Sequence, residues 1–259
     1  MNFPISEYRR VTYKGLVIDD YLVHPSGEFL NLGCSLQELN LAEVKDAFFR
    51  VSYGRPSYNR GYYAVDIGPR NQSGRRTKWK VHRIIFDTFP DMLYKPSPLV
   101  REFNLHGLPG EKKHIVTETG KEICVSLSID HVDRIPSNNQ SFNLRLATHV
   151  EQNLNRGVVG DSKYKGVSLV SSLSWLRKHR KSKYFQAQCA VFPQFCKRLY
   201  AYFYPHRTPN AEKLAALKYN EFVLENLTEV FGSRLGQQIY DEVAYKNVVM
   251  PNEQLTLNL

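Results

Sequence analysis

The residue types best suited to chemistry gather in one short stretch of the chain. Asp130 and His131 stand at the end of an apolar run, and Asn143 and Arg145 follow after a polar loop. A histidine can take a proton from water near neutral pH, and a carboxylate suits a hard divalent ion such as Mg²⁺. Phosphodiester hydrolysis needs a deprotonated water and a cation for the charge that develops on the phosphate. Adjacent residues of a strand point to opposite faces, so Asp130 and His131 can serve one site only if the backbone bends after the strand.

The elements predicted around these residues form a compact unit. We expect a strand over residues 122–129, a polar loop over 134–141, a short strand over 143–146 and a helix over 148–155. Thr148 and Glu151 have the spacing of a capping box at the start of that helix. This order would gather the polar groups on one side of the unit.

The chain before residue 115 is predicted to be rich in strands, with short helices. The turn residues at 24–27 predict a hairpin. The other elements expected there are a helix over 36–51, strands over 61–67 and 78–81, and a helix over 81–89 that ends at Pro90. The segment 96–120 contains several prolines and glycines, and we expect it to be a loop or insertion.

The charge of the chain is concentrated in one segment. The formal net charge is +10, and residues 156–207 hold eleven Lys and Arg against one acid, so the rest of the chain is neutral. One strongly basic segment on a neutral body is typical of a protein that binds a polyanion, and a solvated lysine-rich face is the alternative. We expect strands over 164–169, 184–192 and 198–204 here, followed by a helix over 210–227.

Composition argues against several classes of protein. Hydrophobic residues make up 42% of the chain, but no stretch approaches the ~18 consecutive apolar residues of a membrane span. The N-terminus lacks the pattern of a secretory signal, so we expect a cytoplasmic protein without membrane contact. The four cysteines form no CxxC pair, which argues against a structural zinc site and favours thiols that are mostly buried.

The stretch that begins at Asp130 resembles a known motif. Asp130-His131-Val132-Asp133, with Asn138-Asn139, Asn143-Leu144-Arg145 and Thr148, is similar to the HNH motif of intron- and phage-encoded homing endonucleases. The run VHRIIFDTF at 81–89 resembles the helix that precedes the motif in that family, and 61–65 the strand before that helix. The resemblance covers roughly residues 20–157.

The resemblance implies a ββα-metal site with one divalent ion, Mg²⁺ or Mn²⁺. His131 would be the general base and Asp130 a metal ligand. Asn143 would hold the loop that orients His131, and Arg145 would lie near the phosphate. Asp133 would stabilise the loop.

The second metal ligand departs from the family's pattern. The family usually has an asparagine nine residues after the asparagine of Asn-Leu, and this chain has Gln152 there, followed by Asn153. The carbonyl of Gln152 can ligate, although it is one methylene longer. Alternatively Asn153 takes over, which requires a turn of about 100° along the helix.

Residues 162–231 resemble the AP2-type DNA-binding domain that often follows this HNH class. The resemblance implies that a three-stranded sheet lies in a DNA major groove, where Gln and Arg read base edges and Lys neutralises phosphates. The residues then expected to contact DNA are Lys163, Lys165, Ser168, Lys183, Gln186, Gln188, Arg198 and Tyr200.

Together these observations predict an α+β fold. The expected domains are a β-rich N-terminal module with the pre-HNH helix over 1–115, an HNH core over 116–157, an AP2-like domain over 162–231 and a C-terminal tail over 232–259. The expected function is a homing-type endonuclease that acts on double-stranded DNA. The alternative is a non-cleaving, sequence-specific DNA-binding protein that keeps the HNH scaffold. The target sequence, the number of strands cut, and the choice between monomer and homodimer stay open.

Overall fold

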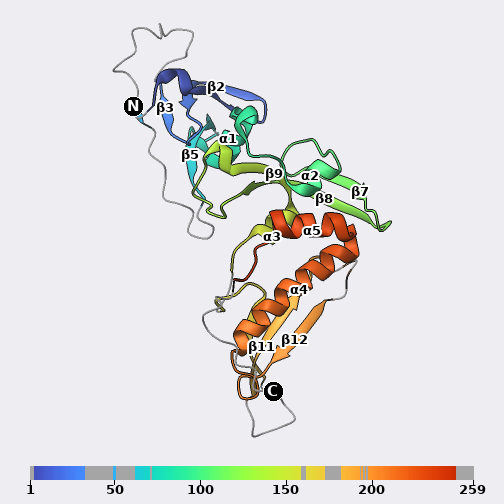
Figure 1. The fold of residues 1–259 in the computed structure, drawn as a ribbon. Coiled ribbons are helices and arrows are strands. Elements are labelled where there is room, and N and C mark those ends of the chain that lie inside the picture. Colours follow the sequence, from blue (N-terminus) through green and yellow to red (C-terminus); the bar gives the residue numbers. More distant parts are fainter. Residues whose placement is uncertain are drawn as a thin grey trace. The chain divides into compact units, whose positions relative to one another are not determined.

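The computed structural model describes residues 3–32, 49–50, 62–70, 72–158, 162–172, 182–192, 194, 196 and 198–248. Within these ranges the fold is α+β, as the sequence predicts, with small antiparallel sheets and a C-terminal pair of helices on a three-stranded sheet (Figure 1). The chain divides into two compact units. The first unit holds residues 1–96, 106–111 and 127–147, and the second unit holds residues 97–105, 112–126 and 148–259.

The first unit begins with the short 3-10 helix η1 (Ile5–Glu7) and a sheet of strands β1 (Arg9–Tyr13), β2 (Leu16–Val23), β3 (Phe29–Asn31) and β4 (Phe49–Arg50). The hairpin predicted around residues 24–27 is confirmed, because Val23 pairs with Phe29 across the turn. The helix expected over 36–51 is wrong at residues 49–50, which form β4 because their backbone pairs with β3. The remaining positions of that expected helix, 36–48 and 51, lie outside the described residues.

A second hairpin leads directly into a helix. Strands β5 (Ala64–Arg70) and β6 (Arg76–Lys80) pair, and α1 (Val81–Thr88) follows without a linker. The strand and helix predicted from these patterns are confirmed. Helix α1 ends before Pro90, which opens the 3-10 helix η3 (Pro90–Met92), because proline lacks the amide hydrogen that a continuing helix needs.

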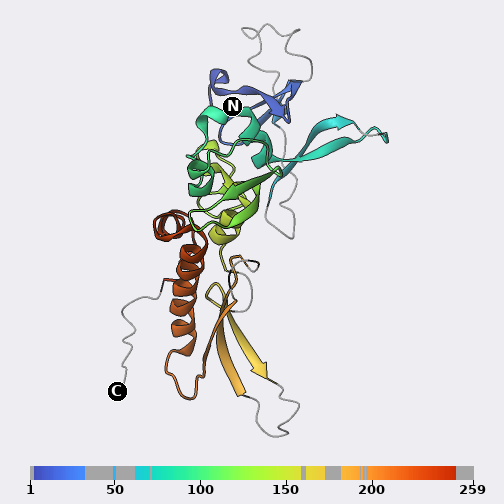
Figure 2. The ribbon, with the colours of Figure 1, turned by 90° about the vertical axis from the view of Figure 1, so that its right-hand side faces the viewer.

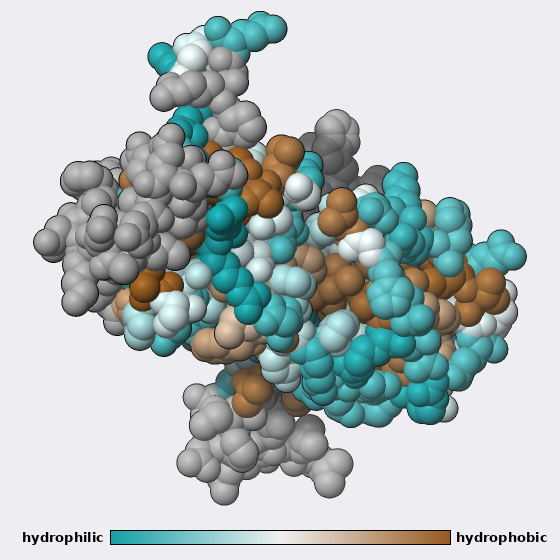
Figure 3. All heavy atoms as spheres, turned by 90° about the horizontal axis from the view of Figure 1, so that it is seen from above, coloured by the Kyte–Doolittle hydropathy of each residue, from teal (hydrophilic) through white to brown (hydrophobic). Residues whose placement is uncertain are grey.

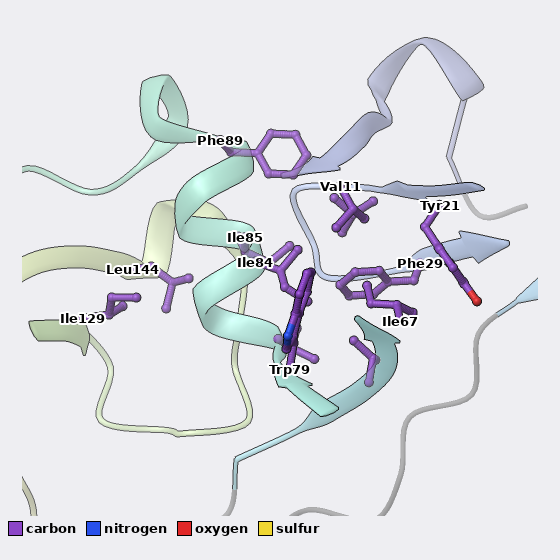
Figure 4. Packing of buried hydrophobic residues seen from close by; sticks show 13 residues of the cluster. Val11, Tyr21, Phe29, Ile67, Trp79, Ile84, Ile85, Phe89, Ile129 and Leu144 are labelled. Carbon is purple, nitrogen blue, oxygen red and sulfur yellow. The ribbon is translucent and has the colours of Figure 1, made fainter. Parts of the chain in front are cut away.

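Helix α1 packs at the centre of the first unit's core (Figure 4). Ile84 and Ile85 are fully buried. The cluster that they join includes Val11, Trp79, Phe89, Ile129 and Leu144. Each fully buried side chain of this kind contributes roughly 1.5–3 kcal/mol to folding. The core therefore fixes two chain positions that are adjacent to candidate site residues, Ile129 before Asp130 and Leu144 before Arg145.

The candidate motif lies on strands β8 (Glu122–His131) and β9 (Leu144–Thr148), with the 3-10 helix η4 (Ser141–Asn143) before β9 and helix α3 (His149–Asn155) after it. The predicted strands and helix are confirmed. The segment 96–120, expected to be a loop, instead contains α2 (Pro98–Glu102) and β7 (Lys112–Val116). Proline fits the first turn of a helix, and β7 pairs with β8 in antiparallel register. Both elements are short, so their sequence patterns are weak.

The second unit contains an antiparallel sheet of β10 (Val167–Ser172), β11 (Ser182–Cys189) and β12 (Leu199–Phe203), covered on one face by α4 (Ala211–Phe231) (Figure 2). The three predicted strands and the predicted helix are confirmed. Helix α5 (Ser233–Glu242) lies in the segment that was expected to be a tail. A Cβ on Gly236 would lie 2.8 Å from the backbone nitrogen of Thr228, so this glycine allows α5 to approach α4 closely.

No helix in the described part of the chain combines the length and the apolar character that a membrane span needs.

On the face seen in Figure 3, hydrophobic groups of the described residues lie among hydrophilic ones. The exposed hydrophobic residues include Leu169, Tyr200 and Tyr202, which belong to the three-stranded sheet of the second unit.

Candidate active site and nucleic-acid surface

His131 is the last residue of β8, where the strand enters a tight turn. The amide of Arg134 donates to the carbonyl of His131 at 3.0 Å, and Arg134 has a positive φ of 68°. Asp130 and His131 are exposed by only 4% and 5%. The bend expected from the sequence follows directly after His131, and the strand itself extends two residues further than predicted.

The imidazole of His131 is held by Asn139. Its Nε2 lies 3.1 Å from Oδ1 of Asn139. An amide oxygen only accepts, so with this orientation of the amide Nε2 carries the hydrogen and the basic lone pair is on Nδ1. Burial lowers the pKa of His131 from its ordinary value, while the hydrogen bond to Asn139 and the charge of Asp130 act in the opposite direction. The net shift favours the neutral form of the ring, which is the form that a general base requires.

Asn143 closes the loop that follows His131. Its Oδ1 accepts from the amide of Asp133 at 3.0 Å, and its Nδ2 donates to Oδ1 of Asp133 at 2.9 Å and to the carbonyl of Asn138 at 2.8 Å. Nδ2 of Asn138 donates to Oδ2 of Asp133 at 2.6 Å. These bonds join both sides of the loop. The hydrogen bonds that the Asp133 carboxylate accepts lower its pKa.

Asp130 and Arg145 form a buried ion pair. Nε and Nη2 of Arg145 donate to Oδ2 of Asp130 at 3.0 and 2.8 Å. The side chain of Asp130 is 5% exposed and that of Arg145 is 3% exposed. The structure thus brings together three residues expected at the site, namely Asp130, His131 and Arg145, within neighbouring positions of β8 and β9. Arg145 contacts a carboxylate here, although the resemblance implies a place beside a phosphate.

The donor types fit a hard cation. Carboxylate and amide oxygens are ligands that Mg²⁺ accepts, and Asp130, Gln152 and Asn153 supply them. Among the described residues, no group of three or more His, Cys, Asp or Glu side chains is arranged to hold a metal ion. Gln152 and Asn153 lie on α3 in the second unit, where Gln152 is half-buried and Asn153 is exposed. The structure describes the positions of both residues within the second unit.

Two aromatic rings beside His131 were not among the expected site residues. The ring of His82, on α1, lies 5.4 Å from that of His131 at an angle of 75°, and Tyr62 packs against both at 4.9 and 5.8 Å. Burial and nearby positive groups lower the pKa of His82 well below its ordinary value. Its Nδ1 has no hydrogen-bond partner among the described residues. The helix carrying His82 was recognisable in the sequence, but the approach to His131 depends on tertiary packing.

Helix α3 begins with the predicted capping box. The Thr148 hydroxyl accepts from the amide of Glu151, and the Glu151 carboxylate accepts from the amide of Thr148. Glu151 is fully buried and also accepts from Ser97 and from the amide of Leu99. Burial raises the pKa of Glu151, and these hydrogen bonds oppose that shift. Glu151 therefore anchors α3 to the N-terminal end of α2.

Lys165 has a different environment from the one expected of a DNA contact. It precedes β10, and its Nζ donates to the carbonyls of Asn153, Leu154 and Arg156 at 2.9, 2.6 and 2.6 Å. These carbonyls belong to the end of α3 and the residue after it, where helix geometry leaves them without intrahelical partners. Lys165 thus caps α3.

The other residues expected to contact DNA differ in their position on the sheet. Cross-strand pairs join Ser168 to Gln186 and Gln188 to Tyr200, and these four side chains lie on the face opposite α4. The face toward α4 carries the buried Val167, Ala187 and Cys189. By alternation Lys183 belongs to the α4 side, although it is exposed at the strand's start. Lys163 and Arg198 are exposed outside the strands.

Comparison of the chain with protein-family models, with curated proteins and with solved structures finds no match. The site is therefore characterised by its own residues. One group is the loop after β8 with His131, Asn139 and Asn143, and the other is the open face of the three-stranded sheet.

Proposed function

We propose that this chain is a site-specific DNA endonuclease of the HNH type, in which His131 is the general base. The observation that carries the proposal is the environment of His131: a buried imidazole at the end of β8, held through Nε2 by Asn139. The loop that presents it is closed by Asn143.

The proposed reaction begins when Nδ1 of His131 takes a proton from water. The resulting hydroxide attacks the phosphorus, the bond from phosphorus to the leaving oxygen breaks, and the leaving oxygen takes up a proton from water. Asn139 keeps the ring in the tautomer that this step requires. When bound, one Mg²⁺ or Mn²⁺ would supply a positive charge for the phosphate, and Asp130 is proposed as its ligand from the first unit.

The second unit is proposed to deliver double-stranded DNA to this loop. The basic segment 156–207 carries as much net charge as the whole chain, and it includes the three-stranded sheet. Lysines and arginines there would contact phosphates, which gives affinity that falls as salt rises. Lys165 is left out of this set because it caps α3.

A second candidate function is DNA binding without cleavage. The buried pair of Asp130 and Arg145 favours it, because a guanidinium already compensates the carboxylate that would hold the metal. The Gln152 substitution in the motif favours it as well.

Cleavage of supercoiled plasmid DNA in Mg²⁺ or Mn²⁺ separates the two candidates. We expect the wild type to nick or cut and His131→Ala to lose this activity at every metal concentration. His106→Ala, at an exposed histidine of the first unit, is the matched control and should cleave normally. A footprint on DNA without cleavage by the wild type would favour the second candidate, and cleavage retained in His131→Ala would remove His131 as the base.

A further inference from the structure

The face of the three-stranded sheet opposite α4 carries exposed aromatic rings. Tyr200 and Tyr202 are exposed by 43% and 52%. Their rings are parallel within 5°, with centroids 6.5 Å apart, and Tyr184 meets Tyr202 edge to face at 5.4 Å. The three tyrosines come from the neighbouring strands β11 and β12. They form one group, which we name the tyrosine face.

The other described side chains on the tyrosine face are uncharged. Alternation and register place Ser168, Val170, Gln186 and Gln188 there. Positive charge stands at the margins instead. Arg198, which is exposed, directly precedes β12. A ligand with a negative backbone and flat apolar groups matches this distribution.

We propose that the tyrosine face binds unpaired DNA bases by stacking, so that the DNA recognised by this chain contains a locally opened segment. In a closed duplex the flat faces of the bases are covered by their neighbours, and groove readout relies on polar groups such as Arg and Gln that reach base edges. Rings of tyrosine are instead suited to the faces of bases that have left the stack. Gln186 and Gln188 can donate to and accept from the exposed edges of such bases.

The inference takes DNA as the ligand and in that respect rests on the proposed function. In this inference the sheet captures opened bases, instead of reading base edges in a closed major groove. The contact of rings with bases is apolar, so its contribution persists when salt weakens the phosphate contacts at the margins.

Equilibrium binding of the full chain, measured by fluorescence anisotropy in EDTA so that no DNA is cut, tests the inference. The probes share one sequence: a closed duplex, the same duplex with a central mismatched bubble, the single strand, and the corresponding single-stranded RNA. We expect the bubble to bind roughly tenfold or more tightly than the closed duplex, since each stacked base is worth about a factor of ten. This preference should persist at high salt.

Variants assign the preference to the tyrosine face. Tyr200→Leu combined with Tyr202→Leu should remove it, whereas the corresponding phenylalanine variant, which keeps both rings, should retain it. Tyr94→Leu, at an exposed tyrosine of the first unit, is the matched control. If the leucine variant folds poorly, photo-crosslinking of a bubble carrying 5-iodouracil to the wild type provides the reading, with attachment expected at Tyr184, Tyr200 or Tyr202.

Three outcomes would overturn the inference. Equal affinity for bubble and closed duplex, or crosslinks only outside the tyrosine face, would do so while leaving the proposed nuclease intact. Tighter binding of the RNA would assign the face to a different nucleic acid. Binding to none of the DNA probes would overturn the inference, and the plasmid cleavage assay in Mg²⁺ or Mn²⁺ would show separately whether the proposed nuclease fails as well.

Discussion

At the scale of single residues, the pairing of Asp130 with Arg145 sets the electrostatics of the candidate site. Both side chains are almost fully buried, and two donor atoms of the guanidinium meet one carboxylate oxygen. Removing both charges together often costs little, whereas removing one partner leaves an uncompensated charge in a poorly solvated place. Arg145 therefore compensates the charge of Asp130, the residue next to His131. Asp130 and Arg145 act together as one electrostatic pair.

A double-mutant cycle measures this dependence. Arg145→Met should reduce the free energy of unfolding of the first unit by about 3–5 kcal/mol, because the buried Asp130 carboxylate loses the guanidinium that compensates its charge. Adding Asp130→Asn should recover much of the loss. Urea unfolding can be followed through Trp79, which lies in the first unit's core and becomes the sole tryptophan in a Trp175→Phe background. Equal losses in the single and double variants would contradict this account of the pair.

At the scale of elements, α3 is held at both ends by contacts within the second unit. Thr148 and Glu151 cap its N-terminus, and the ammonium of Lys165 binds the carbonyls at its C-terminus. A cation at that end also opposes the partial negative charge of the helix dipole. The residues proposed as second metal ligand, Gln152 and Asn153, lie between these two caps.

Lys165→Met is expected to loosen α3 and to leave the salt dependence of DNA binding unchanged. Hydrogen bonds from a charged donor contribute roughly 1.5–3 kcal/mol, so amide hydrogen exchange in residues 149–157 should accelerate. Lys183→Met, at an exposed lysine, is the comparison: it should leave exchange in α3 unchanged and lower the salt slope of DNA binding by about one. A reduced salt slope in Lys165→Met would instead identify Lys165 as a phosphate contact.

The elements predicted correctly are those whose signals are local. The turn around residues 24–27, the apolar spacing of α1 and the capping box at Thr148 each lie within a few residues of chain. Helix α5 is different, because its position depends on the close approach that Gly236 allows toward α4. The same contrast holds at the candidate site. His131 and Asn143 stand in one motif, but the contacts of His82 and Tyr62 with His131 arise only when distant segments pack together.

At the scale of the whole molecule, the described cysteines are free thiols whose reactivity is set by their surroundings. Cys124 is exposed on β8, whereas Cys189 is buried on β11 beneath α4. Burial raises the pKa of Cys189 to about 12, so almost none of it is the reactive thiolate at pH 8. The expectation of mostly buried thiols agrees with Cys189 and Cys196, and Cys124 is the exposed one among the described cysteines.

Alkylation with iodoacetamide at pH 8, followed by peptide mass spectrometry, tests this distribution. In a Cys34→Ser background we expect Cys124 to react rapidly and Cys189 to react only after urea unfolds the second unit. Comparable rates at Cys124 and Cys189 in the native protein would show that the packing of α4 on the sheet opens readily.

The two units are interleaved along the chain. The backbone passes between them five times, after residues 96, 105, 111, 126 and 147. Residues 148–259 alone would lack Arg101 and Lys121, which contact Glu242 and Glu229 on α5 and α4. Transfer of one continuous stretch of the gene therefore cannot move the whole second unit into another protein. The loop after β8 and the three-stranded sheet are therefore expected to be inherited together.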